Sequence, residues 1–117
     1  MEAEDKIRWR ALVKLLRWEC PCALPVQVRR VRMPADCYGD TEFRGGGARP
    51  HFRVRIGRDL CYSIAKATLI HEWAHCLSDR TEAWQAERRV ATDHSSRWGI
   101  EFAFVYRVVE EEEDRNG

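Results

Sequence analysis

Apolar residues recur at helical spacing in three parts of the chain and alternate with polar residues in two others. Residues 1–20 are predicted to form an N-terminal helix that covers the core. Its apolar stripe comprises Ile7, Ala11, Leu15 and Trp18, widened by Trp9, Leu12 and Leu16. The stripe is followed by the sequence CPCALP, whose first proline predicts the end of the helix.

Two segments show the alternation of half-buried β-strands. In residues 52–56 apolar side chains alternate with arginines, so we expect one face to pack and the other to meet solvent or a ligand. In residues 26–33 the alternation changes phase at Arg29–Arg30, which predicts a strand with a bulge.

The segment 34–50 lies between these strands and shows no period. It contains four glycines and two prolines, and it is long for a structureless connection inside a compact domain. We therefore expect a flexible loop, formed either as a mobile flap or as a loose hairpin. Its composition predicts the most mobile internal segment of the chain.

Helical spacing returns in the second half of the chain. Helices are predicted over residues 62–79, over the short connection 81–90 and over 94–110. The apolar stripe of the last helix comprises Trp98, Phe102, Val105 and Val109. Residues 111–117 are expected to form an acidic tail. This order of elements predicts one α+β domain over residues 1–117.

Composition narrows the class of protein. A chain of 117 residues has the length of one domain with one modest core. Its 20 basic and 19 acidic residues nearly cancel, so the whole molecule offers no strong field to nucleic acid or to a membrane. Five cysteines and a charged N-terminal stretch indicate a soluble, reduced, cytoplasmic protein without a membrane segment. We expect a monomer.

Two of the four histidines stand four positions apart in the sequence TLIHEWAHCLS. At about 100° per residue, His75 lies only about 40° from His71 on the helix, and the apolar residues of this stretch lie on the other side. Two neutral imidazoles so placed can reach one Zn²⁺ at about 2.0–2.1 Å, and Glu72 beside them is the expected general base. Chance also produces this spacing on exposed helices, but a face without packing residues favours the metal site.

A catalytic zinc usually has three protein ligands and keeps a fourth position open, so a third ligand must come from another segment. His94 is the preferred candidate, because it opens the final helix and follows Asp93, a carboxylate suited to orient its ring. Glu101 is the competitor on the same helix face. It stands about 10 Å further along the helix axis, so both residues cannot bind one ion.

The stretches LIHEWAH, FRVRIG and DHSSRWG together resemble the minimal zincin-like metallopeptidases, in particular SprT-like proteins and small phage and prophage proteins of that architecture. The resemblance covers about residues 51–109. It implies a minimal zincin-like fold with one catalytic Zn²⁺ on His71, His75 and His94 and with Glu72 as the catalytic carboxylate. It also implies a protein or peptide substrate, which we expect to pair in extended form with strand 52–56.

A second hypothesis comes from a different class, a zinc-stabilised binding module without catalytic activity. Residues 29–58 contain eight arginines against three acidic residues, which indicates either the solvated faces of two strands or a weak contact surface for nucleic acid or acidic peptide. Glu72 favours the enzyme, because a structural zinc site has no use for a base. Cys20, Cys22 and Cys37 fit no standard zinc module and are expected as buried thiols.

Overall fold

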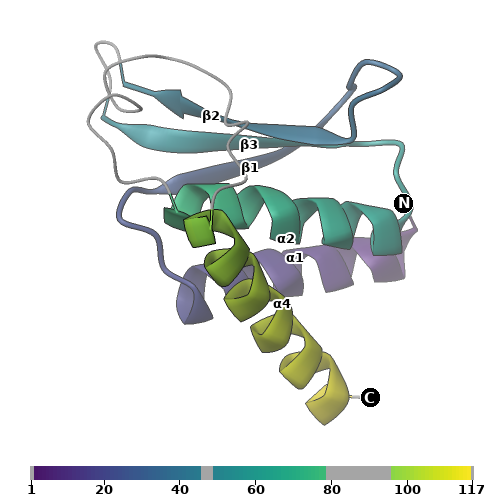
Figure 1. Ribbon diagram of the computed structural model, residues 1–117. Helices are drawn as coiled ribbons and strands as arrows, with labels where there is room; N and C mark the ends of the chain where they lie inside the picture. The colour runs from purple at the N-terminus through teal and green to yellow at the C-terminus, as the bar shows by residue number, and fades with distance from the viewer. Residues whose placement is uncertain (1, 46–48, 79–95, 117) are drawn as a thin grey trace.

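The computed structural model describes residues 2–45, 49–78 and 96–116. Its helices are α1 (Ala3–Glu19), α2 (Tyr62–Ser78) and α4 (Ser96–Asn116), and its strands are β1 (Val26–Val31), β2 (Gly39–Arg44) and β3 (His51–Gly57). The sheet covers one side of α2, α1 runs beside α2, and α4 crosses α2 and extends away from the sheet (Figure 1). The α+β class is confirmed. The helix predicted over 81–90 lies outside the described residues.

Helix α1 forms where it was predicted but buries a different face. It ends at Glu19, one residue before Cys20, whose N–H still donates to the Leu16 carbonyl at 2.8 Å. Pro21 follows, and the helical conformation is unfavourable for a residue that precedes a proline, so the helix ends here. The main predicted stripe is wrong, because Ile7 and Trp18 are 66% and 82% exposed, whereas Leu12 and Leu16, which were expected to widen it, are buried. The buried residues are Leu12, Val13 and Leu16. Apolar side chains occupy more than one face of this helix, so spacing alone did not select the face that meets the core.

The three strands form one sheet in the order β1-β3-β2. β1 runs parallel to β3, and the two stay in continuous register from Val26 opposite Phe52 to Val31 opposite Gly57. The bulge predicted at Arg29–Arg30 is therefore wrong. Arg30 stays in register with Ile56 and is half-buried. Its guanidinium donates to the carbonyls of Gly57 (2.8 Å) and Leu60 (3.1 Å).

The flexible loop predicted over 34–50 is wrong for residues 39–44, which form β2 and pair antiparallel with β3. The pairing agrees with the hairpin alternative. The glycines of this segment suggested a loop, but Gly39 is needed for packing. A Cβ at this position would lie 2.7 Å from the Arg55 carbonyl oxygen and 2.8 Å from Thr68 Cγ2. The glycine thus permits close approach of two strands and a helix. The inward side chains of β2, Thr41 and Phe43, are buried.

Helix α4 is longer than predicted, because the acidic residues expected as a tail belong to the helix, which ends at Asn116. Glutamate is a good helix former, and Glu113 contacts Lys66 of α2 at 2.7 Å. Val105 and Val109 of the predicted stripe are buried. The helix therefore continues to pack through the segment that was expected to be free.

The core lies between the sheet and the helices. The strand alternation predicted for 52–56 is confirmed, since Phe52, Val54 and Ile56 are at most 1% exposed. Trp73 of α2 is buried, and its indole N–H donates to the Cys20 carbonyl at 2.9 Å. Among the described residues, none of the helices has both the length and the apolar character needed to cross a membrane.

Candidate metal centre

Helix α2 holds the histidine pair on a rigid and largely buried support. The helix contains neither glycine nor proline, and the Ala65 N–H donates to the Cys61 carbonyl at 2.9 Å where it begins. The apolar side chains expected opposite the histidines are all buried, namely Ile70, Trp73, Ala74 and Leu77. Their packing fixes the rotation of α2 about its axis, so the orientation of His71 and His75 follows from the core.

The two histidines lie close together, as their spacing predicted. Their ring centroids are 5.2 Å apart, and the ring planes are inclined by 66°. His75 is only 3% exposed, whereas His71 keeps a partly exposed side chain. One imidazole is therefore enclosed, and the other is partly exposed.

Trp98 of α4 covers the histidine pair. Its ring lies 5.0 Å from the His71 ring and 5.7 Å from the His75 ring, centroid to centroid. The Trp98 indole N–H also donates to the backbone carbonyl of His71 at 3.3 Å. This contact ties the start of α4 to the centre of α2. The indole excludes water from the side of the imidazoles that it covers.

Glu72 is 6% exposed, and its two carboxylate oxygens have different surroundings. The Thr41 hydroxyl of β2 donates to Oε1 at 2.8 Å and also lies 3.2 Å from the Glu72 backbone carbonyl. Oε2 lies 3.8 Å from Nε2 of His71. The sheet thus holds one oxygen while the other faces the histidine.

The same surroundings shift the proton affinity of Glu72. Burial raises the pKa of Glu72 to about 7, the hydrogen bond from Thr41 lowers it, and the charge of Asp40 raises it. Burial dominates because water that would stabilise the ionised carboxylate is largely excluded. A carboxyl with a pKa near neutrality can both accept and release a proton at physiological pH.

The expected third ligand is not settled by the structure, because His94 lies outside the described residues. The competitor Glu101 is half-buried on α4, and its charge contributes to the raised pKa of the Cys20 thiol. Within residues 2–45, 49–78 and 96–116, no three His, Cys, Asp or Glu side chains are grouped to hold a metal. The choice between His94 and Glu101 as the third ligand therefore stays a prediction.

The five cysteines differ in how deeply they are buried. Cys20 is fully buried, and burial first, then the nearby Cys22, Glu19 and Glu101, raise the pKa of its thiol to about 12. Cys22 and Cys37 are only half-buried, so the expectation of buried thiols holds for Cys20 and not for these two. Cys76 is also buried in the core. Within the described part of the chain, none of the five cysteines forms a disulfide.

Three arginines of β2 and β3 pair with acidic residues of β2. Arg55 donates through Nε to Asp40 at 2.8 Å, and Arg53 lies 3.9 Å from Glu42. Arg44 contacts the same Glu42 at 2.9 Å. These pairs favour the interpretation of the arginine-rich strands as a solvated structural face.

Strand β3 cannot accept a substrate by edge pairing, contrary to the expectation for 52–56. It is the central strand of the sheet, with β1 on one side and β2 on the other. The prediction failed because it assumed no partner in the segment 34–50, where β2 lies. In the sheet formed by the described residues, the edges are β1 and β2.

Two residues of the site were missed or misinterpreted from the sequence. Thr41 stands 31 positions before Glu72 in the segment interpreted as a loop, and no sequence signal connects the two. Trp98 was assigned to the packing stripe of the last helix. Its contact with both imidazoles gives that position a second role, which its place shortly after His94 could have suggested.

The described residues fit two ligands of a zinc site and its general base. Imidazole nitrogen is a preferred zinc ligand, and the pair lies on adjacent turns of one helix. The buried carboxylate beside them has one oxygen held by a neutral hydroxyl and the other directed at the partly exposed imidazole. Comparison of the chain with protein-family models, curated proteins and solved structures found no match. The interpretation of the candidate metal centre therefore rests on the geometry of its residues.

Proposed function

We propose that this protein is a zinc-dependent metallopeptidase of the minimal zincin-like type. The observation that supports the proposal is the buried carboxylate of Glu72, held by Thr41 and directed at His71 on the helix that presents both histidines. Burying a carboxylate costs free energy, and carboxyls with a strongly raised pKa are frequent at catalytic sites.

In this proposal His71 and His75 would hold the zinc ion together with His94. When bound, zinc lowers the pKa of water to about 7 and polarises the carbonyl of the scissile peptide. Oε2 of Glu72 accepts the proton of the attacking water and then passes it to the leaving amine. Oε1 remains bonded to the Thr41 hydroxyl, which prevents the carboxylate from rotating away.

The substrate would bind along β2 and not along β3. β2 is an edge strand of the described sheet, and its residue Thr41 touches the proposed base. An extended peptide paired with this edge would run directly past the centre of α2, where the chemistry takes place. This replaces the expectation that strand 52–56 accepts the substrate.

The decisive experiment compares the wild type with Glu72→Gln and His71→Ala. Zinc content, melting temperature and cleavage of a mixed peptide library are measured for each protein. Glu72→Gln should keep its zinc and its fold but lose activity by roughly 10²–10⁴-fold, because an amide cannot act as a base. His71→Ala should lose zinc affinity and melt at a lower temperature, because metal binding is coupled to folding.

Glu111→Gln is the matched control, since it makes the same chemical change at an exposed position of α4. It should leave all three measurements unchanged. Undiminished cleavage by Glu72→Gln would refute the mechanism. A wild type that binds zinc and cleaves nothing would support the alternative, a zinc-stabilised binding module.

The third ligand is tested separately by His94→Ala and Glu101→Ala. We expect the first variant to lose zinc affinity and the second to retain it. The reverse result would make Glu101 the ligand.

A further inference from the structure

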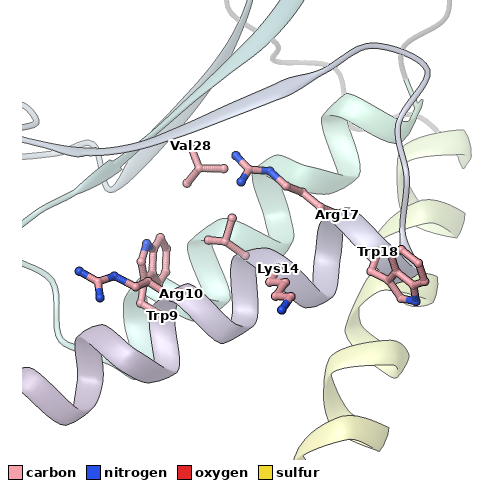
Figure 2. Close-up of a pocket in the computed structure, with 7 residues that line it drawn as sticks. Trp9, Arg10, Lys14, Arg17, Trp18 and Val28 are labelled. Atoms are coloured by element: carbon pink, nitrogen blue, oxygen red, sulfur yellow. The ribbon is translucent and has the colours of Figure 1, made fainter.

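A groove of about 580 Å³ lies between α1 and β1 (Figure 2). It is lined by Trp9, Arg10, Val13, Lys14, Arg17, Trp18 and Val28. Three of these residues are cationic, two are aromatic and two are aliphatic, and none is a carboxylate. The groove thus differs in composition from the outer face of the sheet.

The cations of the groove form one row along α1. Arg10, Lys14 and Arg17 follow each other at spacings of four and three residues, which places them on one helix face over about 10 Å of the axis. All three are exposed, and within the described part of the chain none of them forms an ion pair. Their charges therefore remain available to an anionic partner.

One cation is fixed over the strand. Arg17 donates through Nη2 to the Val26 carbonyl at 3.0 Å, and its side chain extends toward Val28 (Figure 2). A guanidinium held in this way loses less conformational entropy when it binds an anion. The groove therefore has at least one preorganised positive group at its wall.

The aromatic residues give the groove a second property. Trp18, near the C-terminal end of α1 (Figure 2), is 82% exposed, so most of its side chain lies in solvent. Trp9 is half-buried, with the Arg30 guanidinium 4.7 Å from its ring centroid. A large exposed aromatic beside a row of cations is the composition of surfaces that stack unpaired bases.

We propose that the groove binds single-stranded nucleic acid, with Arg10, Lys14 and Arg17 on the phosphates and Trp18 stacked on a base. The row of cations spans about 10 Å of the helix axis, so its members can contact successive phosphates over a short stretch of strand. A duplex keeps its bases stacked inside and offers nothing to Trp18, and an acidic peptide uses only the cations. The inference does not depend on the proposed peptidase function, because no groove residue belongs to the candidate metal centre.

The test uses fluorescence anisotropy of a dye-labelled single-stranded oligothymidine of about 12 nucleotides, a length within the usual site size. The full chain is titrated between about 50 and 200 mM salt. Three phosphate contacts predict a slope of about −2 for log affinity against log salt. Lys14→Gln should weaken binding and reduce the magnitude of the slope by about 0.7.

Trp18→Ala should weaken binding by at least about fivefold without reducing the salt slope, since it removes stacking and no charge. Arg107→Gln and Tyr38→Ala make the corresponding changes at exposed residues outside the groove lining and should leave the affinity unchanged. The melting temperature of every variant is measured, because an unchanged fold is required for the comparison.

Four results would overturn the proposal. They are absence of oligonucleotide binding at the lowest salt, equal losses in the groove variants and the controls, an unchanged affinity in Trp18→Ala, and equally tight binding of a polyglutamate peptide or a duplex of the same length. The polyglutamate result would assign the groove to an acidic protein partner.

Discussion

The candidate metal centre and the α1–β1 groove both combine charged side chains with a tryptophan, but in opposite environments. At the metal centre, the charged residue Glu72 is enclosed, hydrogen-bonded and shifted in pKa, and the indole of Trp98 covers the histidines. In the groove, the cations and the indole of Trp18 lie in solvent. Enclosure fixes geometry, as proton transfer requires, whereas exposure leaves side chains free to adapt to a polymer.

The difference has an energetic consequence. A buried charged group must be held by its neighbours, so changes at the candidate metal centre should affect both folding and the proposed chemistry. Exposed side chains contribute little to folding, so changes in the groove should affect binding alone. Variants of the same residue type in the two regions therefore test this difference.

The largest expected effect compares two tryptophans. Trp73→Ala, which removes an indole that is 1% exposed and its hydrogen bond to Cys20, should lower the free energy of unfolding by about 3–5 kcal/mol. Trp18→Ala should change it by less than about 0.5 kcal/mol. Urea denaturation followed by circular dichroism measures both. A strong destabilisation by Trp18→Ala would show that the groove is part of the packed structure and not a free binding surface.

The next effect concerns the ionisation of Glu72 in the protein kept metal-free by a chelator. The pKa of Glu72 is raised from 4.5 to about 7, so the folded state holds its proton more tightly than the unfolded state does. This contribution to stability is complete below about pH 4.5 and is lost as the pH rises through 7. Glu72→Gln removes the ionisation and should therefore gain about 1–3 kcal/mol relative to the wild type between pH 5 and pH 8.

Denaturant midpoints at the two pH values give this difference, and Glu111→Gln serves as the exposed control. The control should show the same pH dependence as the wild type. If Glu72→Gln also followed the wild type, the carboxylate would be solvated in solution, and the contrast between an enclosed and an exposed region would fail.

The fold could be predicted wherever a single periodic pattern was unambiguous. The alternation at 52–56 was confirmed, and the helix predicted over 62–79 forms from Tyr62 to Ser78. The predicted face of α1 was wrong because two overlapping apolar stripes satisfy the same spacing. Gly39 suggested a loop but allows β2 to approach β3, and no sequence pattern distinguishes these two uses of glycine.

The candidate metal centre was predictable only where its residues share one helix. His71, Glu72 and His75 come together by helical geometry alone, which the spacing encodes. Thr41 could not be predicted, because its contact with Glu72 depends on how β2 packs against α2. The third ligand stays a prediction, since His94 lies outside the described residues.

The smallest expected effect tests Thr41 as a positioning residue. Thr41→Val keeps the shape of the side chain but removes the hydroxyl that donates to Glu72 Oε1 at 2.8 Å, and Thr41→Ser keeps the hydroxyl and removes a methyl group. If this hydrogen bond orients the base, the valine variant should lose about fivefold to tenfold in kcat, the equivalent of about 1 kcal/mol, with KM unchanged. The serine variant should retain most of its activity, although losing a buried methyl group costs it some stability. Peptide cleavage and melting temperature are measured for both variants at the same zinc loading. A serine variant as impaired as the valine variant would show that the methyl contact matters and that the hydroxyl does not position Glu72.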